Sequence, residues 1–432
     1  MGAPLSPARV RYALAFLFVV NMVNFVDRQI VNVLAEPIKQ ELGLLDWQIG
    51  VMTGLAFAML YTVLAIPLAR WADSPTVNRG HLISICLAVW SGMTALCGLA
   101  ANFTQLLLAR VGVATGEAGC SPTAHSLISE LVPKARRAAA LAVYSAGIPV
   151  GKLVGLVIGG VVAHTWGWRA AFLVVGVPGV LLAVLSWFTL PEPRVRTAVA
   201  STNEDSLRAL LRMLAPLRTF WLASLGAAFL AFLSYGQAAF LGSFLMRVHG
   251  LNVGEVGLLL GLALGGGGAL GSWVGGLVTD RAVVRDVRAY MLVPAIGGLV
   301  GAALYAVAPL SNSLSWVTAL LVAATAFTSV WYGPIFAAVQ GIVPASRRAS
   351  AAAVHFFVIN IIGIGFGPLM FGLLSDGLSA GFEIFGLPVG GIGPAEGVRH
   401  ALSIGACVGA AATIFLLFGA STIRGELSPS KS

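Results

Sequence analysis

Five charged residues lie inside long apolar stretches of the sequence: Asp27, Arg28, Arg110, Glu117 and Lys152. A charged side chain at the centre of a lipid bilayer costs about 2.5–3.5 kcal/mol on insertion scales, so such residues face water or one another. A rise of about 1.5 Å per residue along each predicted helix places Asp27 level with Arg110, and Glu117 level with Lys152. We therefore predict two ion pairs, Asp27–Arg110 and Glu117–Lys152.

These pairs have the chemistry of a proton-dependent binding site. Burial favours the neutral form of a carboxyl group and a neighbouring cation favours its anion, so a carboxyl group under both influences can exchange protons. We predict that Asp27 and Glu117 bind protons, and that their protonation frees Arg110 and Lys152, with Arg28 beside them, to bind an anionic group. The alternative is that the pairs only join neighbouring helices and that Arg28 only braces the helix beside Asp27.

The composition indicates which elements position these charges. Of the 432 residues, 58% are hydrophobic and only 10% are charged, whereas about 25% are charged in globular proteins. A stretch of about 20 apolar residues crosses a bilayer as a helix. The sequence predicts twelve such helices and hence an all-α integral membrane protein. Their ranges are 12–33, 47–71, 81–101, 104–130, 138–163, 168–190, 220–246, 254–279, 289–309, 314–340, 350–374 and 397–420.

Basic residues set the predicted orientation. Most of the 26 Lys and Arg residues fall on one side of the predicted helices, which places both termini in the cytoplasm by the positive-inside rule. The net charge of +9 therefore reflects orientation and does not indicate nucleic-acid binding. The longest loop, residues 191–219, is predicted to contain a cytoplasmic amphipathic helix over 206–214. The Ala- and Gly-rich composition favours a bacterial inner membrane.

The chain contains an internal repeat. The string VPxxRRA occurs at 132–138 and again at 343–349, and Asp73 and Asp280 follow the second and eighth predicted helices at a similar offset. Such a repeat predicts two six-helix halves, 1–190 and 220–432, joined by the linker 191–219, with a substrate site near the bilayer midplane. We predict that these aspartates, with Arg79 and Arg281, hold neighbouring helix ends together as a cytoplasmic gate. The alternative is that they only set the orientation.

The segments around the two aspartates resemble the loop motif GxLaDrxGRR of the major facilitator superfamily. The second copy matches it well at Gly276, Asp280 and Arg281, whereas the first is degraded and has Ala69 in place of the leading Gly. The segments NFVDRQI, RVGVATGEAGCSPTAHSLISELVP and GWRAAFLVVGVPG further resemble spinster-like transporters. Anion:cation symporters share the DR and GEA residues of these segments. Lys152 departs from the spinster pattern, in which a small residue is usual at this point.

The resemblance implies a major facilitator fold and the movement of lysophospholipid- or sphingolipid-like molecules, often with proton coupling. The second branch implies a proton-coupled symporter of a small organic anion. The expected partners are therefore a lipid-like or organic-anion substrate, protons and membrane lipid, with the protein acting as a monomer and without a cofactor. The sequence has no HExxH or Walker string and no zinc-type cysteine spacing, so we expect neither an enzyme nor a metal site.

Further candidate substrate-binding residues are polar or aromatic and lie within the spans: Tyr144, Tyr235, Trp331 and His355. A polar group in the middle third of a span needs a partner, and for each residue the alternative is packing against a neighbouring helix. Glycines at 147, 151, 155 and 159 form a stripe that permits close helix approach. In the major facilitator superfamily, which the chain resembles, this region packs against the eighth span, so the resemblance implies that the stripe packs there.

Overall fold

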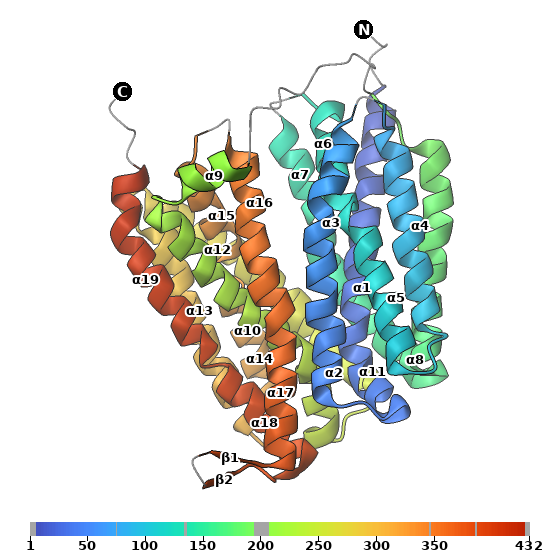
Figure 1. Cartoon of the computed structure of the whole chain (residues 1–432), viewed down its shortest axis with the longest axis vertical. Coiled ribbons are helices and arrows are strands. Elements are labelled where there is room, and N and C mark those ends of the chain that lie inside the picture. Colours follow the sequence, from blue (N-terminus) through green and yellow to red (C-terminus); the bar gives the residue numbers. More distant parts are fainter. Residues whose placement is uncertain are drawn as a thin grey trace. The chain divides into compact units, whose positions relative to one another are not determined.

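The computed structural model describes residues 6–74, 76–133, 136–193, 207–344, 347–384 and 387–427. Regular structure in these ranges is helical, as the sequence predicts, apart from a short antiparallel hairpin of strands β1 (Phe382–Ile384) and β2 (Leu387–Val389). The chain divides into two compact units, which are described separately (Figure 1). Unit 1 comprises residues 1–44, 56–201 and 251–261, and unit 2 comprises residues 45–55, 202–250 and 262–432.

Unit 1 is a helical bundle in which α1 packs along α8, and α4 packs against both α8 and α5 (Figure 1). Its helices are α1 (Pro7–Leu42), α3 (Ala56–Asp73), α4 (Arg79–Cys97), α5 (Phe103–Ala118), α6 (Cys120–Leu131), α7 (Arg137–Ser145), α8 (Gly147–Thr189) and α11 (Val253–Leu260).

Unit 2 contains the remaining elements and the amphipathic helix predicted in the linker, which is confirmed as α9 (Leu207–Leu214). Leu210 and Leu214 of α9 are buried against the core of unit 2. The other helical elements are α2 (Asp46–Gly50), η1 (Val51–Leu55), α10 (Arg218–His249), η3 (Gly261–Gly267, with Gly261 in unit 1), α12 (Gly268–Val283), α13 (Ala289–Val307), η4 (Ala308–Leu310), α14 (Leu314–Thr328), α15 (Tyr332–Gly341), α16 (Arg348–Ile359), η6 (Asn360–Phe366), α17 (Gly367–Ala380), α18 (Gly393–Gly405) and α19 (Val408–Leu427).

The described part of the chain has 10 helical stretches long and apolar enough to cross a membrane, where the sequence predicts twelve. Two features account for the difference. Helix α8 carries two predicted spans in one run, separated at Gly167, whose backbone is not helical (φ 82°, ψ 164°). The fourth predicted span forms two helices, α5 and α6, which meet at Gly119, so neither is long enough to cross a membrane alone.

Each unit includes a short segment from the other half of the sequence. Residues 45–55 belong to unit 2 and residues 251–261 belong to unit 1, and the two segments occupy corresponding positions in the repeat. Each follows a long helix that ends at a left-handed glycine, Gly43 (φ 64°) or Gly250 (φ 67°). Side chains disfavour this backbone conformation. The repeat therefore extends to the ends of helices α1 and α10.

The glycine stripe of α8 packs against α1, so the prediction that it packs against the eighth span is wrong. A Cβ atom at Gly151 would lie 2.4 Å from the backbone oxygen of Met22. The eighth predicted span approaches α8 elsewhere, where Gly160 lies against Gly257 of α11. The stripe correctly indicates close helix packing, but its periodicity does not specify which helix is the neighbour.

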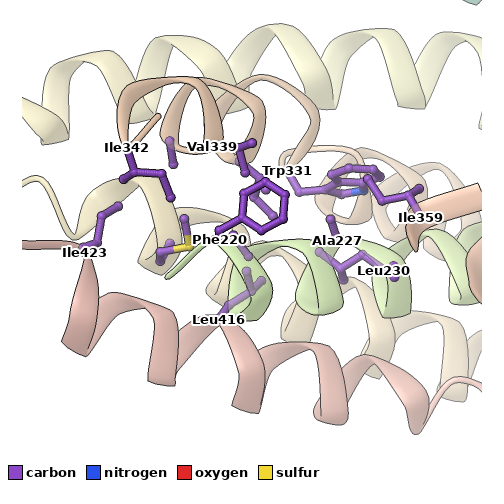
Figure 2. Packing of buried hydrophobic residues seen from close by; sticks show 14 of the residues in the cluster. Phe220, Ala227, Leu230, Trp331, Val339, Ile342, Ile359, Leu416 and Ile423 are labelled. Atoms are coloured by element: carbon purple, nitrogen blue, oxygen red, sulfur yellow. The ribbon is translucent and has the colours of Figure 1, made fainter. Parts of the chain in front are cut away.

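The core of unit 2 is an apolar cluster formed by residues from α9, α10, α13, α15, α16 and α19 (Figure 2). Phe220 and Leu230 of α10 lie there with Leu416 of α19, and Trp331 is buried among them. Because lipid tails are as apolar as these side chains, close packing between helices, rather than removal from water, stabilises such a core within the membrane.

Candidate functional site

Among the five charged residues inside the predicted spans of unit 1, Glu117 forms an ion pair with Arg28. Arg28 Nε of α1 donates a hydrogen bond to Glu117 Oε2 of α5 at 2.5 Å, and the Glu117 side chain is fully buried. The rings of Phe25, Phe57 and Tyr61 lie 5.2, 4.9 and 4.5 Å from the Arg28 guanidinium carbon. Aromatic faces stabilise a cation at such distances. Arg28 is thus held by both charge and aromatic contacts.

The predicted Glu117–Lys152 pair is wrong. Residue counting along a helix gives the depth of a side chain but not the direction in which it points, and Arg28 at the same site takes the carboxylate. Lys152 lies on α8 directly after Gly151, the point at which that helix touches Met22 and Phe25 of α1. It is partly exposed and has no hydrogen-bond or ion-pair partner among the described residues.

The predicted ion pair between the Asp27 carboxylate and the Arg110 guanidinium is also not formed. Arg110 Nη1 donates to the backbone carbonyl oxygen of Asp27 at 3.4 Å, so the two residues are neighbours, but the carboxylate–guanidinium bond is absent from the structure. Both carboxylate oxygens of Asp27 are buried without a hydrogen-bond partner in the described part of the chain. Trp90 and Thr94 are neighbours of this carboxyl group, but the Trp90 N–H and the Thr94 hydroxyl form no hydrogen bond with it.

Together, the two acids present unused acceptors in the interior of unit 1. Glu117 Oε1, like both oxygens of Asp27, is buried and has no hydrogen-bond partner in the described ranges. Buried polar atoms are nearly always hydrogen-bonded, and each exception calls for an explanation such as a functional role. The arrangement provides three carboxylate oxygens able to accept a proton or a donor from a ligand.

The remaining substrate-binding candidates are divided between the two units. In unit 1, the Tyr144 hydroxyl lies 3.5 Å from Ser121 Oγ. In unit 2, His355 is buried and its Nδ1 lies 2.9 Å from Ser224 Oγ. Tyr235 is partly exposed on α10.

Trp331 lies within the apolar cluster (Figure 2). Its ring stacks on Tyr332 at 4.1 Å, and its Nε1 is buried without a hydrogen-bond partner among the described residues. The roles of these four side chains in binding stay predictions.

Arg79 is the best-defined of the predicted gate residues. It is wholly buried, and its Nη2 atom contacts Glu130 at 2.7 Å and Glu192 at 2.5 Å while Nη1 donates to Ser126 at 3.1 Å. These contacts join the start of α4 to α6 and to the segment after α8, as predicted for an arginine that holds helix ends. Asp280 and Arg281 are exposed at the end of α12, and the side chain of Asp73 lies outside the described part of the structure.

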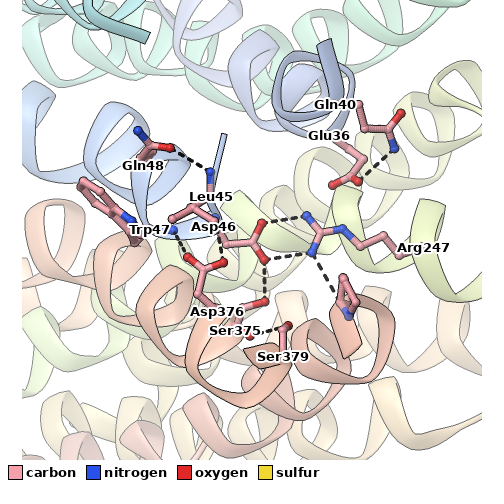
Figure 3. Close-up of polar contacts among 11 residues, drawn as sticks. Glu36, Gln40, Leu45, Asp46, Trp47, Gln48, Arg247, Ser375, Asp376 and Ser379 are labelled. Atoms are coloured by element: carbon pink, nitrogen blue, oxygen red, sulfur yellow. Dashed lines mark hydrogen bonds and ion pairs between the residues drawn. The ribbon is translucent and has the colours of Figure 1, made fainter. Parts of the chain in front are cut away.

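A second polar cluster, within unit 2, is absent from our sequence predictions (Figure 3). The guanidinium of Arg247 at the end of α10 donates two hydrogen bonds to the carboxylate of Asp46, at 2.7 and 2.9 Å. Ser375 Oγ donates to the same carboxylate at 2.6 Å. The carboxylate of Asp376 accepts the backbone N–H groups of Asp46 and Trp47 at 3.0 and 2.7 Å and thereby caps α2.

The sequence holds only a weak signal for this outer cluster, which comprises Asp46, Arg247, Ser375 and Asp376. Three of its members are charged and lie at predicted span ends opposite the cytoplasmic side. They are separated by more than a hundred positions, so only the fold brings them together.

Similarity to known proteins agrees with the motifs. The Major Facilitator Superfamily profile matches residues 17–368. An MFS-type efflux pump of Mycolicibacterium smegmatis is 35% identical over 374 residues, 87% of this chain and 86% of that protein. The probable L-galactonate transporter of Escherichia coli is 26% identical over 389 residues, 84% of this chain and 83% of that protein.

A solved structure shares nearly the whole fold. It is that of a bacterial homologue of the human lysosomal transporter Spinster, in an inward-facing and unoccupied conformation. Its TM-score is 0.88 at 32% identity, and the match covers 99% of this chain and 100% of that chain. The resemblance stated from the sequence motifs is therefore confirmed.

Proposed function

Because this chain belongs to the Major Facilitator Superfamily, we propose that it is a proton-coupled secondary transporter of an amphipathic lysophospholipid- or sphingolipid-like molecule. It works by alternating access, in which the two halves expose a central site first to one side of the membrane and then to the other. The family and the similar proteins support a transporter rather than an enzyme. The choice of cargo follows the likeness to the Spinster homologue.

The observation that carries the proton coupling is the set of three unpartnered carboxylate oxygens on Asp27 and Glu117. An unpaired carboxylate anion is expensive to bury, and binding a proton removes that cost. Protonation of Glu117 also ends its attraction for the Arg28 guanidinium. Arg28 is then able to bind an anionic group of the cargo, which links proton uptake to binding.

The outer cluster indicates which contacts would break during the alternating-access change of conformation. Residues 45–55 follow α1 after Gly43 and Leu44, yet α1 belongs to unit 1 and this segment belongs to unit 2. If the units move relative to each other, either residues 45–55 separate from unit 2 or the connection through Gly43 and Leu44 changes its backbone conformation. We propose that the Asp46–Arg247 bonds and the Asp376 cap break when the outer side opens. Arg79 and the residues of the loop motif act at the cytoplasmic side.

A small organic anion is the second candidate cargo. Two observations favour it, the unpartnered ammonium of Lys152 and the likeness to a probable L-galactonate transporter. Such a cargo requires no apolar tail.

The test is cargo-dependent proton movement in proteoliposomes. Purified protein is reconstituted with a pH-sensitive dye inside the vesicles, and lysophosphatidylcholine or galactonate is added outside. We expect proton flux with the lysolipid and its loss in Glu117→Gln, which removes one proton-binding carboxyl group. Glu396→Gln, at a partly exposed position of α18, serves as the matched control and should retain the flux.

Two results contradict the proposal. Flux with galactonate alone rejects the lipid cargo and favours the organic anion. Lysolipid movement without proton flux in both the wild type and Glu117→Gln rejects the coupling.

A further inference from the structure

The five charged residues inside the predicted spans of unit 1 carry unequal numbers of positive and negative charges. Arg28, Arg110 and Lys152 carry three positive charges, whereas Asp27 and Glu117 carry at most two negative charges. Glu117 is bonded to Arg28, and Arg110 contacts the backbone carbonyl of Asp27. Lys152 is the member of this set without any hydrogen-bond or ion-pair partner in the described ranges.

Lys152 points away from the side of α8 that carries exposed apolar residues. At 3.6 residues per turn, Val150 and Val161 lie roughly opposite Lys152 around the helix axis, and both are largely exposed. One neighbouring face of α8 packs on α1 through Gly151, and another packs on α11 through Gly160. Lys152 lies between these two packed faces, and the residue stays partly exposed.

The only other partly exposed cation of the five is Arg28, which Glu117 and three aromatic rings already hold. Arg28 and Lys152 act on each other electrostatically as like charges. An anion placed between them relieves this repulsion and satisfies the ammonium, and proton binding by either acid raises the excess of positive charge.

We propose that Lys152 selects a cargo whose head group carries a net negative charge, such as a phosphodiester or carboxylate without a compensating cation. This inference rests on the proposed transport function and narrows its cargo. A zwitterionic head brings its own cation to a site that already has an excess of positive charge. A lysolipid with a phosphoglycerol head is therefore preferred over one with a phosphocholine head and the same tail.

The test compares three probes on the full-length protein in neutral detergent: lysophosphatidylglycerol, lysophosphatidylcholine of the same chain length, and galactonate. Binding is measured by ligand-dependent thermal shift for the wild type, Lys152→Gln and Lys152→Arg. Lys39→Gln, at the end of α1 outside the predicted span, is the matched control. The unliganded Tm of each variant shows whether it is folded.

We expect the wild type to bind the anionic lysolipid about ten-fold more tightly than the zwitterionic one, since hydrogen bonds to charged groups are the strong ones. Lys152→Gln should remove this preference by lowering the affinity for lysophosphatidylglycerol more than the affinity for lysophosphatidylcholine. Lys152→Arg and Lys39→Gln should retain the preference. Equal preference in the wild type and a folded Lys152→Gln overturns the inference, as does an equal loss for both lysolipids.

The galactonate arm separates this inference from the proposed function. If galactonate alone binds and Lys152→Gln abolishes its binding, the lipid cargo is rejected and charge selection by Lys152 stands. If the lysolipids bind without any charge preference, the lipid cargo stands and the selection is rejected. If none of the three probes binds the wild type, both are rejected.

Discussion

The two halves of the repeat place different chemistry at corresponding positions. The offset of 211 residues between the VPxxRRA strings pairs Glu117 with Thr328 and Lys152 with Gly363. Thr328 donates its hydroxyl to the backbone oxygen of Ala324 in its own helix at 2.8 Å, and Gly363 permits close contact with α10. Unit 1 therefore has charged side chains at two positions where unit 2 has a threonine hydroxyl bonded within its own helix and a glycine without a side chain.

The same contrast appears at the helix ends that the sequence predicts to be cytoplasmic. The offset of 207 between Asp73 and Asp280 pairs Arg79 with Asp286. Arg79 is buried among two glutamates and a serine, whereas Asp286 forms an exposed pair with Arg424 at 2.7 Å. A repeated fold thus preserves the location of an ionic contact while changing its sign and its burial. Because the energy of a charge depends on burial, corresponding variants should have very different effects.

The largest expected effect is at the interior ion pair. Arg28→Gln leaves the Glu117 carboxylate buried without its cation, which should lower the free energy of unfolding by about 3–5 kcal/mol and abolish transport. At the corresponding position of α10, Tyr235→Phe should cost about 1 kcal/mol or less. Thermal unfolding in detergent measures both variants. Adding Glu117→Gln to Arg28→Gln should recover most of the lost stability, and a double variant as unstable as the single one contradicts the pairing.

The next effect concerns Arg79, the buried arginine at the start of α4. Arg79→Gln breaks the ion pairs with Glu130 and Glu192 and should lower the free energy of unfolding by about 3 kcal/mol. Asp286→Asn, at the corresponding position, should lower the Tm only slightly because its partner is exposed. Denaturation of the two variants side by side gives the comparison. Equal Tm losses show that burial does not distinguish the two sites.

A smaller effect distinguishes a helix N-cap supplied by a residue far away in the sequence from one supplied by the residue next to the helix. Helix α2 is capped by Asp376 of α17, whereas α11 is capped by its own Asn252, whose side chain accepts from Glu255 N at 3.0 Å. Asp376→Ala and Asn252→Ala should each cost about 1–2 kcal/mol. Only Asp376→Ala should change the transport rate, since it also loosens the outer cluster. Equal transport rates in the two variants refute a gating role for that cluster.

The smallest effect is the acid dependence of the exposed pair. The backbone N–H of Arg288, followed by the Arg424 guanidinium, holds the pKa of Asp286 below its ordinary value of 3.8. A lowered carboxyl pKa stabilises the folded state above the ordinary value, and this contribution disappears as the pH falls through the lowered value. Asp286→Asn should therefore narrow the Tm difference between pH 6 and pH 3 slightly. An unchanged difference shows that the pair contributes nothing to acid stability.

The sequence predicts much of the fold because the signals are local or periodic. Apolar stretches indicate the spans whatever their neighbours, and the amphipathic pattern of α9 is visible within eight residues. The predicted boundary between the fifth and sixth spans coincides with the non-helical backbone at Gly167, whereas the division of the fourth span into α5 and α6 at Gly119 has no counterpart in the apolar pattern. The stripe of α8 indicates close packing correctly but the wrong partner, since any helix can offer a complementary surface.

The candidate site shows the same division. Composition and hydropathy alone identify Asp27, Arg28, Arg110, Glu117 and Lys152 as charges inside the membrane, because the cost of burying a charge makes each one conspicuous. Residue counting also places them at similar depths. The partners depend on how each helix is rotated and which helix lies beside it, and these are properties of the packed structure. The tertiary structure therefore decides that Glu117 binds Arg28 and that Asp46 meets Arg247 and Asp376. It also decides that Lys152 has no partner among the residues that the structure describes.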